Sequence, residues 1–206
     1  MHIAILTFEG FNELDSFIAL GVLQRIKRPD WRVTICGPSD EMTSMNGVTV
    51  RAQSRLEQAA EADAVIVGSG IRTREVAADP ALMARLRLDP ARQLIAAQCS
   101  GTLLLARLGL MAGVPACTDL TTRPWVQEAG VEVLDQPFHA RGNVATAGGC
   151  LASPYLAAWI IARTEGVDAA SAALHYVAPV GEKAAYVENA LRRIAPYLPG
   201  SPGCAS

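Results

Sequence analysis

A cysteine at an abrupt change of sequence pattern is the residue in this chain best suited to chemistry. An apolar run at residues 93–98 stops at Cys99, Ser100-Gly101 follows, and an Ala/Leu-rich run begins at Thr102. This pattern predicts a buried strand, a tight turn that holds Cys99, and a helix from about Thr102. Nucleophile elbows of hydrolases have the same strand–turn–helix arrangement. A thiol beside a helix N-terminus is expected to have a lowered pKa, because the unpaired N–H groups and the helix dipole favour the thiolate. The alternative interpretation is a buried structural cysteine.

Two other segments also follow predicted buried strands. The first strand, residues 2–8, precedes a helix predicted from Glu13 with Asn12 as its N-cap. A later strand ends at Gly68-Ser69-Gly70. This glycine pair indicates either a flexible turn or a loop whose backbone amides face a ligand. Because ligands bind at the carboxyl ends of parallel strands, these segments and Cys99 together predict one site.

The rest of the chain alternates between short apolar runs and helical periodicities. Further strands are predicted at residues 31–36, 47–51, 131–134, 138–141 and 143–147, and further helices at residues 56–61, 72–78, 80–88, 123–129, 151–163, 169–177 and 182–194. This alternation predicts an α/β fold with a mostly parallel central sheet and helices on both faces. No repeat or linker divides the chain. We therefore expect a single domain over residues 1–198 and a flexible Pro/Gly-rich tail at residues 199–206.

Composition narrows the functional classes. Half of the 206 residues are apolar and 18% are charged, which is typical of a globular protein. The net charge of −2 gives no electrostatic basis for nucleic-acid binding. No apolar run reaches membrane-spanning length, and the chain starts without a signal-peptide pattern. The five cysteines form no CxxC pair and the three histidines are isolated, so spacing predicts neither a zinc site nor a disulfide framework. We expect a soluble, reduced, cytoplasmic protein without a metal.

Four segments together resemble the ThiJ/PfpI (DJ-1/PfpI) superfamily, within the class I glutamine amidotransferase-like fold. They are residues 8–15, residues 67–70, the elbow Ala97-Gln98-Cys99-Ser100-Gly101, and residues 143–149. The resemblance implies a flavodoxin-like three-layer sandwich that usually forms a homodimer.

The resemblance also implies roles for individual residues. Cys99 is the nucleophile, and Asp15, on the first helix, matches the family's acid that lies against it; Glu9 and Glu13 are weaker candidates. The amides of Gly70 and Ser100 match oxyanion-type donors, which stabilise charge that develops on a substrate atom.

An aspartate paired with the elbow cysteine resembles the isocyanide hydratase branch. This resemblance implies a cofactor-free lyase that hydrates an isonitrile to an N-substituted formamide through a Cys99 thioimidate, with Asp15 as proton donor. Many members of the superfamily have a histidine after the strand that follows the elbow helix. This chain has Cys117-Thr118-Asp119 there, which disfavours protease and amidotransferase activity.

Other interpretations stay open. One is a glyoxalase- or deglycase-like activity on 2-oxoaldehydes, although that branch generally has glutamate where this chain has Asp15. Another is a redox sensor whose Cys99 oxidises to the sulfinate. A transcription regulator is disfavoured because the chain shows no second helical domain and no basic patch. Cys150, just after Gly148-Gly149 at a predicted helix start, is predicted to pack in the core, with a place near the pocket as the alternative. Trp125 and Trp159 are predicted to make packing or dimer contacts.

Overall fold

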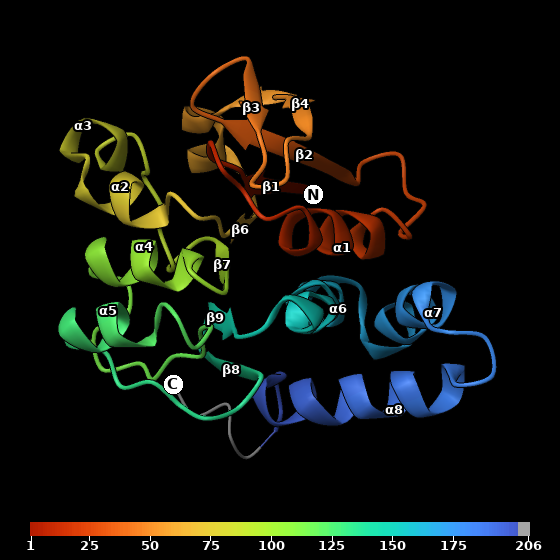
Figure 1. The fold of residues 1–206 in the computed structure, drawn as a ribbon. Coiled ribbons are helices and arrows are strands. Elements are labelled where there is room, and N and C mark those ends of the chain that lie inside the picture. Colours follow the sequence, from red (N-terminus) through yellow and green to blue (C-terminus); the bar gives the residue numbers. More distant parts are fainter. Residues whose placement is uncertain (202–206) are drawn as a thin grey trace.

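A seven-stranded sheet lies between two layers of helices in the computed structural model, which describes residues 1–201 (Figure 1). Its strand order is β5-β2-β1-β6-β7-β9-β8. The strands are β1 (His2–Leu6), β2 (Arg32–Gly37), β5 (Ser54–Arg55), β6 (Ala64–Val67), β7 (Leu94–Gln98), β8 (Phe138–Arg141) and β9 (Val144–Ala147). Every neighbouring pair is parallel except the β8–β9 hairpin, which is antiparallel. The predicted α/β sandwich with a mostly parallel sheet is confirmed. Of the tail predicted at residues 199–206, residues 202–206 lie outside the described part of the chain.

Helices cover both faces of this sheet (Figure 1). On one face lie α1 (Glu13–Leu23), α6 (Ser153–Glu165), α7 (Val167–Val177) and α8 (Lys183–Ile194); on the other lie α2 (Thr73–Ala78), α3 (Pro80–Met83), α4 (Gly101–Arg107) and α5 (Arg123–Glu128). Residues 1–201 also contain three 3₁₀ turns, at Leu56–Glu61 (η1), Cys150–Ala152 (η2) and Ala195–Tyr197 (η3). Within residues 1–201, none of the helices is both long and apolar enough to cross a bilayer.

The central strands are apolar throughout because alternate residues enter two separate cores. In β1, Ile3 and Ile5 pack in the core that contains α1 and α6, whereas Ala4 and Leu6 pack in the core that contains α4. All four side chains have no exposed surface. Burial on both faces therefore explains the continuous apolar run in this strand. Trp159 is also fully buried, in the core that contains α6, which confirms its predicted packing role.

The outer parts of the structure differ from the predictions. Residues 47–51, predicted as an edge strand, contribute β4 (Thr49–Arg51), which pairs with β3 (Glu41–Thr43) in a separate two-stranded sheet. The edge strand beside β2 is instead β5, which has only two residues. Residues 131–134, also predicted as a strand, make one isolated bridge. Such short strand pairings depend on partner strands that lie elsewhere in the sequence, so local sequence patterns do not reveal them.

Three neighbouring strands end at the same edge of the sheet. Leu6 of β1 lies beside Val67 of β6, and Val67 lies beside Ala97 of β7. The segments that follow these strands therefore converge, as expected at the carboxyl edge of a parallel sheet. This edge is where the first helix, the glycine loop and the cysteine turn meet.

Candidate active site

Cys99 occupies a strained turn between β7 and α4. Its φ of 46° lies in the left-handed region, and it is the one non-glycine residue with positive φ among residues 1–201. Its amide donates to the Ala147 carbonyl (2.8 Å), and its carbonyl accepts from the Thr118 hydroxyl (2.8 Å). These partners, from β9 and from the loop that precedes α5, maintain a conformation that is costly for residues other than glycine. The predicted strand–turn–helix elbow is confirmed, with the helix beginning at Gly101.

Gly101 allows the elbow to approach β6 closely. A Cβ atom at this position would lie 2.4 Å from the Val67 carbonyl oxygen and 2.7 Å from that of Gly68. Any side chain here would push α4 away from the end of β6. The glycine two residues after the cysteine is therefore a steric requirement of the turn.

The strain at Cys99 predicts a difference between two variants that both lack the thiol. Cys99→Gly is expected to have a free energy of unfolding about 0.5–1 kcal/mol higher than Cys99→Ala, because glycine adopts positive φ without a Cβ clash. Chemical denaturation of the two purified variants measures this difference. Equal stabilities would show that the turn relaxes once the sulfur is removed.

Asp15 is the acid that lies against the cysteine. Its carboxylate, the Cys99 sulfur and the Cys150 sulfur have donor atoms that all lie within 4.8 Å of one another. Asp15 is 1% exposed, and its Oδ2 accepts a hydrogen bond from the Ser69 hydroxyl. No N–H or O–H group within residues 1–201 donates to its Oδ1. The structure therefore brings the two residues predicted to act together into one buried cluster.

The helix start explains why Asp15 rather than a neighbouring acid reaches the cluster. Asn12 caps α1 by accepting from the Leu14 amide (3.1 Å), as predicted. Glu13 faces the opposite way, where it accepts from Ser44 and from Asn46 (2.9 Å). Glu9 accepts from the Thr43 amide (2.9 Å). Both weaker candidates therefore bind the β3–β4 hairpin.

Burial controls the protonation of the Asp15–Cys99 pair. Burial raises the pKa of the Asp15 carboxyl in spite of hydrogen bonds from Ser69 and the two thiols, and the charge of Asp119 raises it further. Burial also raises the pKa of the Cys99 thiol, and the negative charge of Asp15 adds to that rise. The expectation of a cysteine acidified by a helix terminus is therefore wrong, because desolvation and a neighbouring acid outweigh a seven-residue helix. Both groups therefore hold their protons more strongly than a free carboxyl and a free thiol do, because the pKa of each is raised.

The two predicted amide donors differ in their availability. The Gly70 amide donates to the Ser100 hydroxyl oxygen (3.1 Å), which also contacts the Thr73 hydroxyl (2.7 Å). The Ser100 amide makes no hydrogen bond to another residue in the described part of the chain. A substrate atom can accept from the Ser100 amide directly, and from the Gly70 amide only when the Ser100 hydroxyl turns away. The oxyanion role of both amides stays a prediction.

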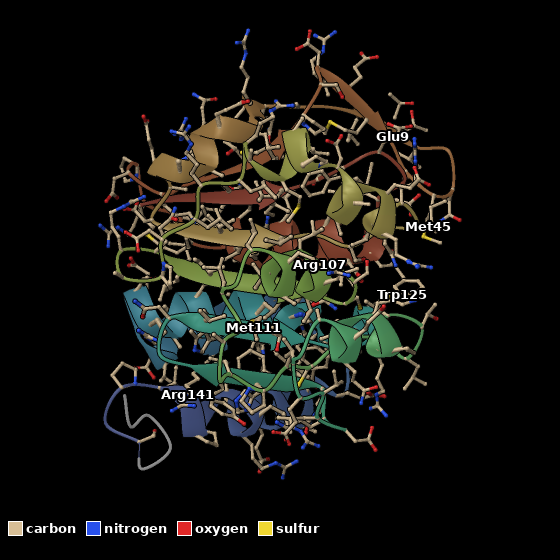
Figure 2. All side chains as sticks on the ribbon, turned by 90° about the vertical axis from the view of Figure 1, so that its left-hand side faces the viewer. Glu9, Met45, Arg107, Met111, Trp125 and Arg141 are labelled. Atoms are coloured by element: carbon tan, nitrogen blue, oxygen red, sulfur yellow. The ribbon has the colours of Figure 1, made fainter. Side chains whose placement is uncertain are left out.

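A cavity of about 400 Å³ opens over the cluster. Met45, Ile71 and Trp125 form the apolar part of its wall. Figure 2 shows Met45 and Trp125 on the same side of the molecule. The guanidinium of Arg74 stacks on the Trp125 ring, 4.6 Å from its centroid. Trp125 packs against the α4 side of the core, as predicted, and it also borders the cavity.

Two cavity residues were not predicted as part of the site. Cys150, predicted to pack in the core, is half-buried at the cavity wall, and its sulfur accepts from the Asn12 side-chain amide (3.2 Å). That prediction is wrong. The available signal was its position directly after Gly148-Gly149, which follow a strand that pairs with β7. Asp119, which stands in place of the family's histidine, also lines the cavity, and its Oδ1 accepts from the Thr122 amide (2.9 Å).

The same cluster contains donor types that Zn²⁺ uses in proteins. Thiolates and carboxylates are ligands of Zn²⁺, and the three groups are close enough to share an ion. Burial raises the pKa of all three groups, so metal binding would require both thiols to lose protons against this shift. The geometry leaves the expectation of a metal-free protein untested.

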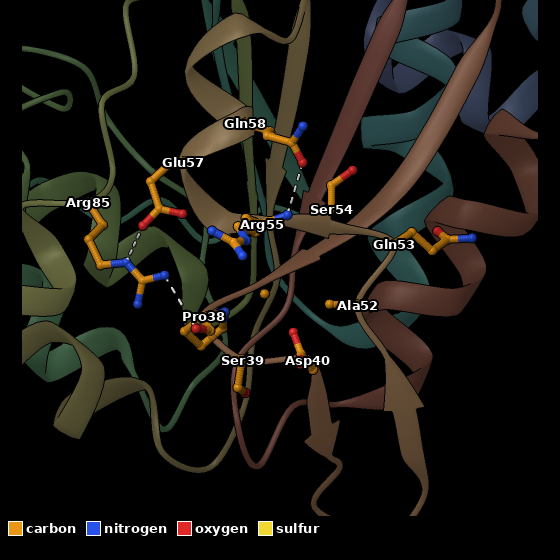
Figure 3. A pocket seen from close by; sticks show the side chains of 11 residues that line it. Pro38, Ser39, Asp40, Ala52, Gln53, Ser54, Arg55, Glu57, Gln58 and Arg85 are labelled. Carbon is orange, nitrogen blue, oxygen red and sulfur yellow. Dashed lines mark hydrogen bonds and ion pairs between the residues drawn. The ribbon is translucent and has the colours of Figure 1, made fainter.

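A second cavity, of about 520 Å³, lies beside β2 and β5 (Figure 3). Its wall is polar, and Arg85 there donates to Glu57 (2.6 Å) and to the Pro38 carbonyl (3.3 Å). None of the described residues that line it is a cysteine or a histidine. The cavity over Cys99 is the candidate active site because it opens over the cluster of Asp15, Cys99 and Cys150.

Comparisons with known proteins agree with this fold. The VC2308 protein superimposes with a TM-score of 0.74 at 20% identity, over 90% of this chain and 97% of that one. Schizosaccharomyces pombe DJ-1 gives a TM-score of 0.73 at 16% identity, over 87% and 100% of the two chains. A cysteine-to-alanine mutant of the DJ-1 superfamily protein STM1931 from Salmonella typhimurium gives 0.70 at 25% identity, over 96% and 98%. No curated protein matches the chain in sequence. The model of the DJ-1/PfpI family matches residues 1–163, and the chain therefore belongs to this family.

Proposed function

We propose that this protein is a cofactor-free lyase that hydrates an isonitrile to an N-substituted formamide. The observation that carries the proposal is the buried carboxyl of Asp15 within 4.8 Å of the sulfur of Cys99, which itself lines a cavity with a partly apolar wall. The aspartate at this position is the feature that resembles the isocyanide hydratase branch.

The first step adds the Cys99 thiol to the terminal carbon of the isonitrile. The S–C bond forms as the thiol proton passes to Asp15, and Asp15 delivers that proton to the same carbon, which gives a thioimidate, R–N=CH–S–Cys99. The step creates no net charge. Burial disfavours the formation of a separate thiolate and a separate carboxylate. It therefore does not disfavour this transfer, which adds no charge to the site. The raised pKa values of Asp15 and Cys99 support a proton shuttle between a neutral thiol and its neighbouring acid.

The second step uses water to release the product. Water adds to the thioimidate carbon and the nitrogen takes a proton. The C–S bond then breaks as a proton returns to sulfur, which leaves R–NH–CHO. Asp15 lies within 4.8 Å of the sulfur, and its carboxyl can take a proton from water and return one. We assign the Ser100 amide to the substrate atom on which negative charge develops, because this amide has no other partner in the described part of the chain.

The reaction is tested by incubating the purified protein with an aryl isonitrile. We expect the isonitrile infrared band to disappear while a product heavier by one water accumulates, as measured by mass spectrometry. A parallel incubation with methylglyoxal, followed by a lactate assay, tests the 2-oxoaldehyde alternative. An unchanged isonitrile together with lactate formation would contradict the proposal and favour that alternative. Light scattering on the same sample tests the homodimer that the family resemblance implies.

A further inference from the structure

The cavity contains two thiols, and the proposed hydration uses only one. Cys150 begins η2, the 3₁₀ turn that follows β9, and its half-buried side chain lines the cavity together with Cys99. Cys36 and Cys117 are fully buried and do not belong to the cluster. Cys150 is therefore a second thiol that can be reached from the same opening as Cys99.

Side-chain amides orient both sulfur atoms. The Gln98 amide donates to the Cys99 sulfur (3.2 Å) and also to the Gly149 carbonyl (2.8 Å), the residue before Cys150. The Asn12 amide donates to the Cys150 sulfur (3.2 Å). One side chain thus links the elbow to the start of the turn that holds the second thiol.

The two sulfur atoms are close enough to bond after a local movement. They lie within 4.8 Å of each other. A disulfide has an S–S length of about 2.05 Å, so the sulfurs must approach by at most about 2.8 Å. Cys150 follows Gly149, which has a φ of 88° and no atom within 4 Å of where a Cβ would lie. Open space on this side of Gly149 therefore leaves room for the residue before Cys150 to shift.

We infer that Cys150 is a resolving cysteine for an oxidised Cys99. A hydroperoxide ROOH oxidises the Cys99 thiol to the sulfenic acid and is itself reduced to ROH. In this step the S–O bond forms, the O–O bond breaks, and Asp15 carries the thiol proton to the leaving oxygen. The Cys150 thiol then attacks the Cys99 sulfur, forms the disulfide and releases water. The inference needs only the reactivity of Cys99 and does not depend on an isonitrile substrate.

The second thiol changes the fate of the oxidised cysteine. Without it, a second hydroperoxide oxidises the sulfenic acid to the sulfinate and is itself reduced to ROH; thiol reductants do not reverse this product. With it, the oxidised state is a disulfide that a thiol reductant restores. The disulfide also removes the nucleophile from the cavity, so the protein would lose its Cys99 chemistry reversibly under oxidation.

The experiment treats the reduced full-length protein with two equivalents of hydrogen peroxide in the presence of a metal chelator, because the sulfinate consumes two equivalents and the disulfide one. Lys and Arg residues separate the five cysteines into five different tryptic peptides, so a cross-link identifies its partners. We expect the peptide of residues 93–107 to be linked to that of residues 142–163, with the mass lowered by two hydrogens and restored by dithiothreitol. Cys150→Ser is expected to give at least about tenfold more sulfinate at Cys99 than the wild type.

Two results would overturn the inference. One is sulfinate at Cys99 in the wild type, in the same amount as in Cys150→Ser and with Cys150 recovered as a free thiol. The other is a Cys99 that stays reduced under excess peroxide. Circular dichroism checks that Cys150→Ser is folded. If the variant does not fold, reversal of the cross-link by dithiothreitol in the wild type still shows whether Cys150 resolves the oxidised Cys99. Because the readout is a mass, a failed isonitrile assay leaves this result intact.

Discussion

Cys99→Ala is expected to lower isonitrile turnover by at least about 10³-fold, to the uncatalysed background. The reason is that the Cys99 sulfur forms the covalent bond to the substrate carbon. No other group in the cluster can form this bond without moving to the position of that sulfur. Cys150 has a thiol within 4.8 Å of the Cys99 sulfur, but it lies outside the elbow turn. Steady-state formation of the formamide by the wild type and the variant measures the effect.

Cys36→Ala is the matched control for this prediction. Cys36 is fully buried on β2 and does not belong to the cavity cluster, so its loss removes a thiol without removing the nucleophile. We expect turnover within a few-fold of the wild type for folded Cys36→Ala protein. Turnover by Cys99→Ala within tenfold of the wild type would contradict covalent catalysis and would leave Asp15 as a simple acid for water addition.

Asp15→Asn is expected to lower kcat by about 10²–10⁴-fold, the usual contribution of a positioned proton donor. The amide keeps the shape of the carboxyl and can still accept from the Ser69 hydroxyl, but it cannot carry a proton from sulfur to carbon. The removal of a negative charge next to Cys99 should at the same time lower the pKa of its thiol. We therefore expect faster alkylation of Cys99 by iodoacetamide at neutral pH together with lost turnover. Slower alkylation would show that Asp15 activates the thiol in the resting protein.

The same substitution should increase stability. Burial raises the pKa of Asp15 in the folded protein above the value of about 3.9 of an unfolded chain. Between these two values the folded protein binds more protons than the unfolded chain, so the free energy of unfolding falls as pH rises, by at most about 1.4 kcal/mol per pH unit. The amide that replaces the carboxyl does not titrate. The variant should therefore lack this fall and be the more stable protein at neutral pH, which urea denaturation at several pH values measures. An identical pH dependence in both proteins would show that Asp15 is not the destabilising acid.

The sequence predicted those parts of the site that depend on local pattern and on sheet topology. A buried strand followed by Cys99 and Gly101 specifies the elbow, and the parallel order of β1, β6 and β7 brings Asp15 to it. Cys150 was missed because its position depends on the pairing of β9 with β7, which local periodicity does not encode. The predicted lowering of the Cys99 pKa was wrong for a related reason. A helix terminus can be predicted from neighbouring residues, whereas desolvation results from the packing of the whole chain.

β9 connects the two thiols mechanically. The Cys99 amide is bonded to the carbonyl of Ala147, the last residue of this strand, and Cys150 follows three positions later on the same backbone. The position of the strand therefore sets the separation of the two sulfur atoms. A local opening of the β7–β9 pair, which hydrogen exchange at the Cys99 amide would report, should release the strained turn and separate the thiols in one event. The lifetime of that single amide hydrogen bond then limits how long the chain keeps its reactive geometry.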